Sequence, residues 1–203
     1  TFIMYFKCVH QFLFMKKYKA VKTVIPVLLL LSIFMQGTLQ AQMLRLPESQ
    51  VNYKCETARK LGATDIAVTW NAPGVKGREG KIWGNDIAPY GFTVLGFGSA
   101  LPSPWRAGAD ESTTVSFSTD VTINGKPLPA GKYGFFIAVY PDSCTLIFNK
   151  NNAGWGSYFY KSDMDVLRVT AYQQKNAAAL KERLEYTFSN QTERSVDLAL
   201  EWE

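Results

Sequence analysis

The sequence predicts an all-β fold, a single antiparallel β-sandwich or jelly-roll-like domain of about eight to nine strands. Apolar and polar residues alternate along several short segments, which is the pattern of strands that bury one face. Turn signals containing Gly, Pro and Asn separate these segments. One long loop rich in Gly and aromatic residues interrupts the series, and ordered loops of this length are usually functional.

The N-terminal segment has the pattern of a secretory signal peptide, which we assign to residues 15–41. Met15 is followed by lysines, an apolar run at residues 23–35, and small or polar residues up to Ala41. We expect cleavage after Ala41 and a periplasmic or secreted protein. The run is shorter than the roughly 20 residues that cross a bilayer, so no integral membrane segment is expected in the mature chain. No Cys lies at or just after the cleavage position, so a lipid anchor is not expected.

The rest of the chain divides into three parts. Residues 1–14 are interpreted as an upstream extension foreign to the natural protein, with a longer natural N-terminus as the alternative. Residues 42–63 are expected to form a leader segment that becomes ordered towards Cys55. Residues 64–203 are then the β-sandwich domain, which is long enough to bury its own core.

Without residues 1–41 the chain carries no formal net charge. Five of the 22 basic residues lie in that segment, which has no acidic residue, so the remaining basic residues balance the 17 acidic ones. We therefore expect no nucleic-acid partner. His10, the single histidine, lies in the same segment, which excludes a Ser-His-Asp triad and a His-bearing zinc site from the domain. No metal site, cofactor or catalytic residue is expected.

The first predicted strand directs Ile66, Val68 and Trp70 inwards and ends at the NAPG turn that follows. Beyond the long loop, Val115 and Phe117 alternate with serines in the next strand. Each of these segments therefore has one face suited to a core.

Asn124 and Gly125 predict a tight hairpin between residues 121–123 and 126–128, because both accept the positive φ that such a turn requires. Residues 133–140 are apolar on both faces and are expected to form a central strand. The other predicted strands are residues 144–149, 166–172, 184–188 and 196–202.

The long loop spans residues 73–112 and carries Trp83, Tyr90, Phe92, Phe97 and Trp105. A short strand is expected around residues 92–97. The loop ends in SPWRAGADES, residues 103–112, which places an indole, a guanidinium and two carboxylates close together.

This motif has two interpretations. In the structural one, the forked donors of Arg106 pair with the carboxylates of Asp110, Glu111 or both and fix the turn. Trp105 then fills the end of the core, and Gly108 takes a backbone conformation that side chains resist. In the functional one, Trp105 stacks on a ligand and Arg106 grips an oxygen-rich group, as in a site for a glycan or small polar molecule.

A second aromatic loop, NNAGWGSYFY at residues 151–160, suits a sugar-stacking platform. The structural alternative is that Trp155 closes the end of the sandwich while the glycines shape the turn. The residues proposed for binding are Trp83, Trp105, Arg106, Asp110, Glu111, Trp155 and Tyr158.

An alternative hypothesis is a carboxylate-dependent hydrolase of glycans or esters that uses Glu111 and Asp110. Neighbouring residues of a strand point to opposite faces, so one of the two would need a distant partner such as Asp86. A further hypothesis is an accessory subunit of an envelope complex. In the favoured interpretation the protein is a non-catalytic ligand-binding or envelope-associated module, with no oligomeric state predicted.

Two cysteines remain in the mature chain, Cys55 and Cys144. In an oxidising compartment they are candidates for one disulfide, and the alternative is two separate thiols.

Several stretches resemble the DUF2911 family: VKGREGKIWG, APYG, SPWRAGADESTTVSFSTDVTINGKPLPAGKYGFF, TLIFNKNNAGWGSY and the terminal ALEWE. The family's pattern W-R-x-G-A-[ND]-E-x-T is present at residues 105–113, and the resemblance covers roughly residues 58–203. It implies an exported, β-rich single domain of the kind common in Bacteroidetes-type bacteria, and it supplies no activity, substrate or catalytic residue. The stretch 92–104 is longer than in shorter members, so a role carried by this loop can differ between members.

Overall fold

The computed structural model describes residues 2–5, 51–173 and 180–203, which belong to one compact unit of the chain. The signal peptide assigned to residues 15–41 lies outside the described residues. In the described part the fold is all-β and antiparallel, as predicted, with one short 3₁₀ helix, η1, at Ser162–Met164.

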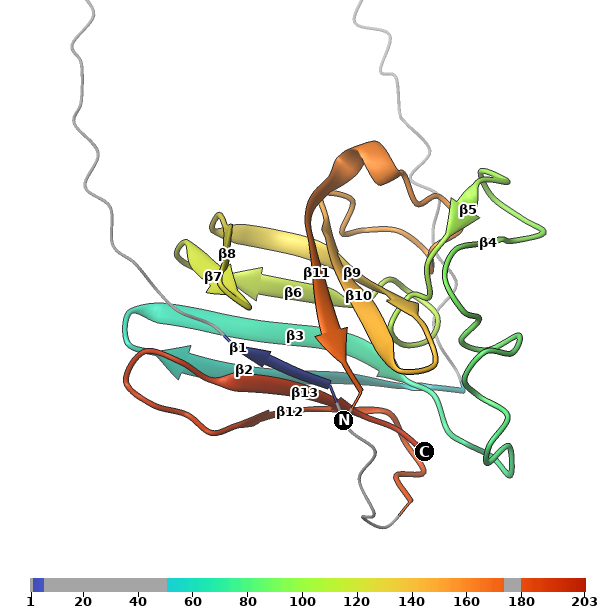
Figure 1. The fold of residues 1–203 in the computed structure, drawn as a ribbon, viewed down its shortest axis with the longest axis horizontal. Coiled ribbons are helices and arrows are strands. Elements are labelled where there is room, and N and C mark those ends of the chain that lie inside the picture. Colours follow the sequence, from blue (N-terminus) through green and yellow to red (C-terminus); the bar gives the residue numbers. More distant parts are fainter. Residues whose placement is uncertain (1, 6–50, 174–179) are drawn as a thin grey trace, which may run out of the picture. The chain divides into compact units, whose positions relative to one another are not determined.

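The larger sheet has six strands in the order β11-β10-β9-β6-β3-β2, and each neighbouring pair is antiparallel (Figure 1). Its strands are β2 (Tyr53–Leu61), β3 (Thr64–Ala72), β6 (Thr114–Phe117), β9 (Gly131–Val139), β10 (Ser143–Asn149) and β11 (Asp165–Tyr172). β2 and β11 therefore form its two edges.

The smaller sheet has the order β1-β13-β12. β1 (Phe2–Tyr5) comes from the segment interpreted as an upstream extension, and its backbone pairs with β13 (Asp197–Glu201). β12 (Glu185–Ser189) pairs with the other side of β13. Buried side chains of β12 and β13 share one apolar cluster with those of β3, β6, β9 and β10, which makes the arrangement sandwich-like.

Two small hairpins complete the fold: β4 (Thr93–Val94) with β5 (Pro102–Ser103), and β7 (Val121–Ile123) with β8 (Lys126–Leu128). Asn124 and Gly125 have φ angles of 48° and 81°, which confirms the predicted tight turn between β7 and β8.

β9 is buried on both faces, as its apolar sequence predicts. Phe135 and Ile137 face the main core, while Phe136 and Ala138 face a second apolar cluster that includes Tyr160. The outer face of the larger sheet is thus covered at this point by the loop that carries Tyr160.

β2 is a strand that the pattern of apolar and polar residues does not predict. Cys55 and Thr57 occupy positions on the half-buried face, and the strand as a whole is largely exposed because it lies at a sheet edge. It begins at Tyr53, within the segment expected to become ordered towards Cys55.

β13 departs from the simple alternation expected of residues 196–202. Asp197 and Ala199 are buried together with the apolar positions. The Asp197 carboxylate accepts a hydrogen bond of 2.8 Å from the amide of Asn190, which compensates for its burial.

Candidate functional site

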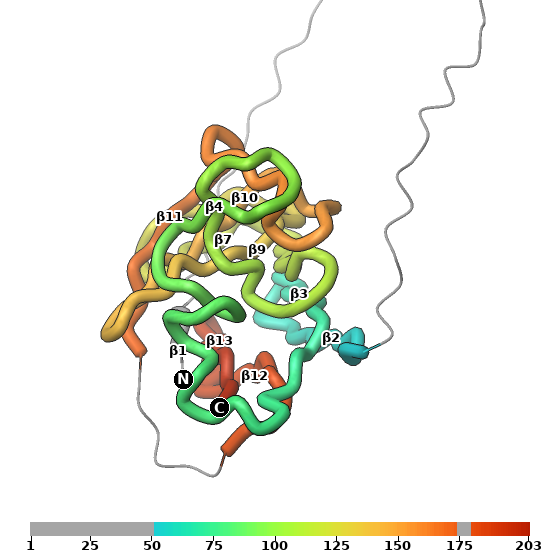
Figure 2. The backbone as a smooth tube through the Cα atoms, turned by 90° about the vertical axis from the view of Figure 1, so that its right-hand side faces the viewer, coloured from blue at the N-terminus to red at the C-terminus, as the bar shows by residue number. Residues whose placement is uncertain are grey.

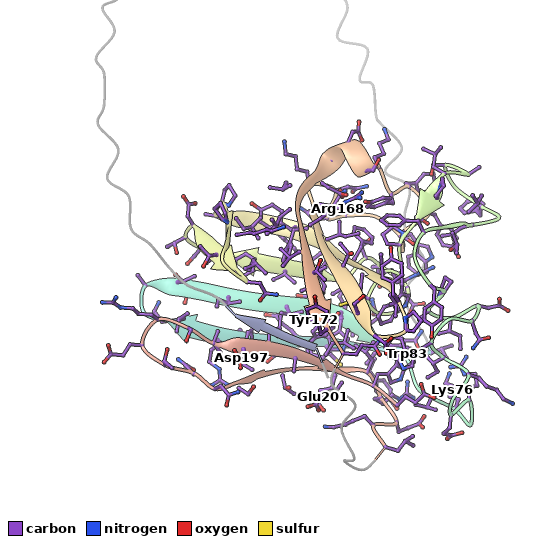
Figure 3. The ribbon with its side chains drawn as sticks, viewed as in Figure 1. Lys76, Trp83, Arg168, Tyr172, Asp197 and Glu201 are labelled. Carbon is purple, nitrogen blue, oxygen red and sulfur yellow. The ribbon has the colours of Figure 1, made fainter. Side chains whose placement is uncertain are left out.

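Trp105 lies inside the protein and forms part of its core. Its side chain is 4% exposed, its ring stacks on Trp202 at 6.0 Å between centroids, and the edge of Trp83 meets it at 5.5 Å. Main-chain hydrogen bonds in both directions join Trp105 to Ile137 of β9. Trp83, labelled in Figure 3 on the long loop, is thereby packed against the core by the other two indoles. A buried indole held in this way supports the fold rather than receiving a ligand.

Arg106 fixes the turn, but by contacts other than the expected carboxylate fork. Its guanidinium donates a 3.0 Å hydrogen bond to the main-chain carbonyl of Asp110 and lies 5.0 Å from the centroid of the Tyr158 ring. It also lies against Gly156, where an added Cβ would overlap with it. The guanidinium is thus clamped between two loops by a carbonyl and an aromatic face.

The two acidic residues of the motif both reach the start of β2. Asp110 accepts a 2.9 Å hydrogen bond from the amide of Asn52. Glu111 accepts one of 2.5 Å from the amide of Asn71 and lies 4.0 Å from the Lys54 ammonium. The expectation that they point to opposite faces is wrong, because Asp110 has a φ of 54° and is not part of a strand. Asp86, the distant partner considered for a hydrolase, is exposed on the long loop.

The role expected of Gly108 also needs correction. The positive φ angles in this turn belong to Ala107 and Asp110, both at 54°. Gly108 is needed for close approach instead, because an added Cβ would lie 2.7 Å from the Thr113 hydroxyl and 3.2 Å from the Asn71 carbonyl oxygen.

The two aromatic loops do meet at one end of the sandwich. Trp155, half-buried, lies opposite Glu111 in an isolated β-bridge, and Ser112 donates a 3.0 Å main-chain hydrogen bond to Gly154. Tyr158 contacts Arg106 on this side. The structure therefore brings together most of the residues proposed for binding, but it packs them against one another in the manner of a structural clip.

An open groove of about 380 Å³ lies elsewhere, between the edge strands β2 and β12. No pattern in the sequence predicts this groove. Its lining includes Tyr53, Cys55, Trp70, Arg183, Glu185 and Tyr186.

Arg183 is the basic residue in the lining of the groove, and it is half-buried. Its guanidinium lies 4.4 Å from the centroid of the Tyr53 ring and donates a 3.2 Å hydrogen bond to the carbonyl oxygen of Ala72. Within the part of the chain that the structure describes, no carboxylate forms an ion pair with it. Glu185, two residues further along the chain, forms a 2.7 Å ion pair with Lys181, and Glu56 of β2 also lines the groove. The groove thus presents a positive charge beside aromatic surface.

Hydrogen bonds fix the side chains of the groove floor and connect them to the turn of the SPWRAGADES motif. The Trp70 indole donates to the carbonyl of Leu184 at 3.1 Å. The Tyr186 hydroxyl donates to the carbonyl of Ala107 at 2.7 Å, and burial raises the pKa of Tyr186 well above its ordinary value. This hydroxyl therefore stays protonated and keeps its donor role at physiological pH.

Cys55 and Cys144, proposed as a disulfide pair, are both free thiols in this structure. They lie on β2 and β10, which β3, β6 and β9 separate in the sheet order. Burial, together with the negative charge of Glu185, raises the pKa of Cys55, and burial raises that of Cys144 to about 12. Neither thiol is therefore an activated thiolate.

Among the described residues, no group of three or more His, Cys, Asp or Glu side chains is arranged to hold a metal ion. None of the helices described is long and apolar enough to span a bilayer.

Comparison with curated proteins and with solved structures yields no match. A family model does match, over residues 52–203, which is most of the chain and includes every element from β2 to β13. The chain therefore belongs to the DUF2911 family, whose members are described as proteins of unknown function.

Proposed function

We propose that this protein is a non-catalytic binding module that holds a small carboxylate-bearing molecule in the groove between β2 and β12. The observation that carries the proposal is the Arg183 guanidinium, which lines the groove without an ion-pair partner among the described residues. A guanidinium has five N–H donors in a planar fork that matches a carboxylate.

The size and lining of the groove support this class of ligand. Its volume of about 380 Å³ is in the range of small-molecule sites. Tyr53 orients Arg183 by stacking, so that less side-chain entropy is lost when an anion binds. Tyr53, which is 64% exposed, supplies aromatic surface on which the body of a sugar acid or an aryl acid can lie, and the buried rings of Trp70 and Tyr186 form the floor beneath.

The chemistry of the groove favours binding over catalysis. The raised pKa of Cys55 keeps its thiol protonated, and the thiol lies 3.5 Å from the carbonyl oxygen of Tyr53. Glu185 is bound to Lys181 in an ion pair. The groove therefore offers orientation and charge rather than an activated nucleophile.

Replacing Arg183 by glutamine tests the proposal. Ligand-induced thermal stabilisation is measured with galacturonate, glucuronate, benzoate and phenylacetate, and with galactose and benzyl alcohol as uncharged counterparts. We expect at least one acid to stabilise the native protein, and Arg183→Gln to weaken its binding about 10- to 100-fold, because a charge-assisted hydrogen-bond pair is lost.

Arg59→Gln is the matched control for this experiment. Arg59 lies on β2, one of the two strands that border the groove, and its guanidinium also stacks on an aromatic ring, that of Phe188 at 5.8 Å, but it does not line the groove. This variant should bind the acid as the native protein does. Stabilisation by none of the acids, or an equal loss in both variants, would contradict the proposal.

We further propose that the protein acts outside the cytoplasm, in the cell envelope or the medium. The support is the basic, apolar and small-residue order of residues 15–41. The intact mass of the protein recovered from the producing cells decides this: a chain beginning close to residue 42 is expected, and a chain that retains residues 15–41 would contradict it.

A further inference from the structure

The loop excursion that contains β4 and β5 carries no charged side chain. Residues 87–105 lack Asp, Glu, Lys and Arg altogether, and so do residues 151–160, the second aromatic loop. Charged residues make up 19% of the whole chain, so two neighbouring loops without any are a distinct feature of its surface.

The two charge-free loops are held together as one unit. Ser99 donates a 2.8 Å main-chain hydrogen bond to the carbonyl of Tyr158, and the Phe97 ring lies 5.5 Å from that of Tyr158 and 6.1 Å from that of Phe159. Gly98 permits this approach, because an added Cβ would overlap with the main chain of Tyr158. Figure 2 shows the excursion at the end of the domain that faces the viewer, beside the segment preceding β11.

Apolar side chains stand exposed on this unit, which we call the apolar tip and define as Val94, Phe97, Leu101 and Phe159. They are 63%, 67%, 55% and 42% exposed, respectively. Leaving four such side chains in water at neighbouring positions is unfavourable unless something covers them. The excursion protrudes at the edge of the domain in Figure 1, so a broad surface fits it better than a small molecule, which would need a concave site.

Basic residues flank the two charge-free loops in the sequence. Of the four positions that flank the charge-free loops, three are basic, namely Arg106, Lys150 and Lys161, and one is acidic, Asp86. Lys150 and Lys161 are exposed. The Arg168 guanidinium lies 5.2 Å from the Phe92 ring at the base of the excursion, but it forms a 2.7 Å ion pair with Asp165, so Lys150 and Lys161 supply the exposed positive charge.

We propose that the apolar tip docks the protein on the surface of an anionic lipid bilayer. Aromatic and aliphatic side chains without charges are favoured at the boundary between headgroups and acyl chains, and flanking Lys and Arg attract anionic headgroups. This apolar centre with a basic rim matches that surface in both polarity and charge. The site lies apart from the groove between β2 and β12 and does not depend on its ligand.

Amide hydrogen exchange on the full chain, with and without vesicles of phosphatidylcholine and phosphatidylglycerol in a roughly 3:1 ratio, tests this docking. The readout is local, so binding through any other segment does not mimic it. We expect exchange at residues 93–101 to slow about tenfold with vesicles, since burial of the tip excludes water from this hairpin. In Phe97→Ser/Leu101→Ser the slowing should disappear, and in Tyr172→Ser it should persist.

Tyr172 is a matched control because it is 72% exposed on β11 and is not part of the tip (Figure 3). Both altered residues of the double variant are mostly exposed, so its melting temperature should stay close to that of the native protein. Unchanged exchange at residues 93–101 in the presence of vesicles would overturn the proposal, as would equal slowing with phosphatidylcholine alone. So would protection that rises with protein concentration without vesicles, because the tip would then be covered by a second copy.

Discussion

Trp105→Ala should destabilise the folded protein by about 3–5 kcal/mol, the range for loss of a large aromatic side chain from a core. The indole is almost fully buried and packs against both Trp83 and Trp202. Its removal leaves a cavity that is bordered by the indoles of Trp83 and Trp202. Urea unfolding followed by far-UV circular dichroism measures the loss as a lower midpoint at unchanged slope.

Two further variants separate packing from ligand binding. Trp105→Phe retains an aromatic ring and should recover part of the lost stability. Tyr172→Ala removes an exposed ring and should change stability by less than about 0.5 kcal/mol. If Trp105→Ala left the unfolding midpoint unchanged but abolished the binding of an acid, Trp105 would be a ligand-contacting residue and the structural interpretation would be wrong.

The strands with one apolar face were predictable from sequence. Ile66, Val68 and Trp70 of β3 point into the protein core, as the alternation indicates. The Asn124-Gly125 turn follows from the backbone preferences of these two residues alone. In both cases the information lies within a few neighbouring residues, so no tertiary contact is needed to interpret it.

The groove could not be predicted in this way. Its walls come from Tyr53 and Arg183, which are far apart in sequence, and the polar residues of β2 give no alternating apolar pattern. The contact between Arg106 and Tyr158 was missed for a related reason. A carboxylate five residues away is a visible partner in the sequence, whereas an aromatic face from another loop becomes a partner only after folding.

The motif at residues 103–112 and the groove are physically connected. The Ala107 carbonyl accepts a hydrogen bond from the buried hydroxyl of Tyr186, and a Cβ added at Gly108 would lie 3.8 Å from the Cβ of Trp70. Tyr186 and Trp70 line the groove. The motif therefore supports the groove floor through Ala107 and Gly108.

Gly134→Ala should also cost stability severely, about 3 kcal/mol, although it adds only one methyl group. Gly134 lies in the central strand β9, where an added Cβ would overlap with the carbonyl oxygen of Asn151 and lie 3.1 Å from the Phe136 ring. Neither the backbone of β9 nor the segment that contains Asn151 can move easily to relieve this overlap. Gly134 is paired in register with Thr114 on one side and Asn149 on the other.

The segment over Gly134 is held in place by its own hydrogen bonds, which is why the overlap cannot be relieved. The side-chain amide of Asn152 donates a 2.8 Å hydrogen bond to the carbonyl of Lys132. The main-chain amide of Asn151 donates one of 2.8 Å to the side-chain oxygen of Asn149. Gly96→Ala is the matched control, since an added Cβ there meets nothing within 4 Å. Thermal unfolding should show a drop of many degrees for Gly134→Ala and almost none for Gly96→Ala. Equal melting temperatures would mean that the 149–152 segment does not lie on β9 in solution.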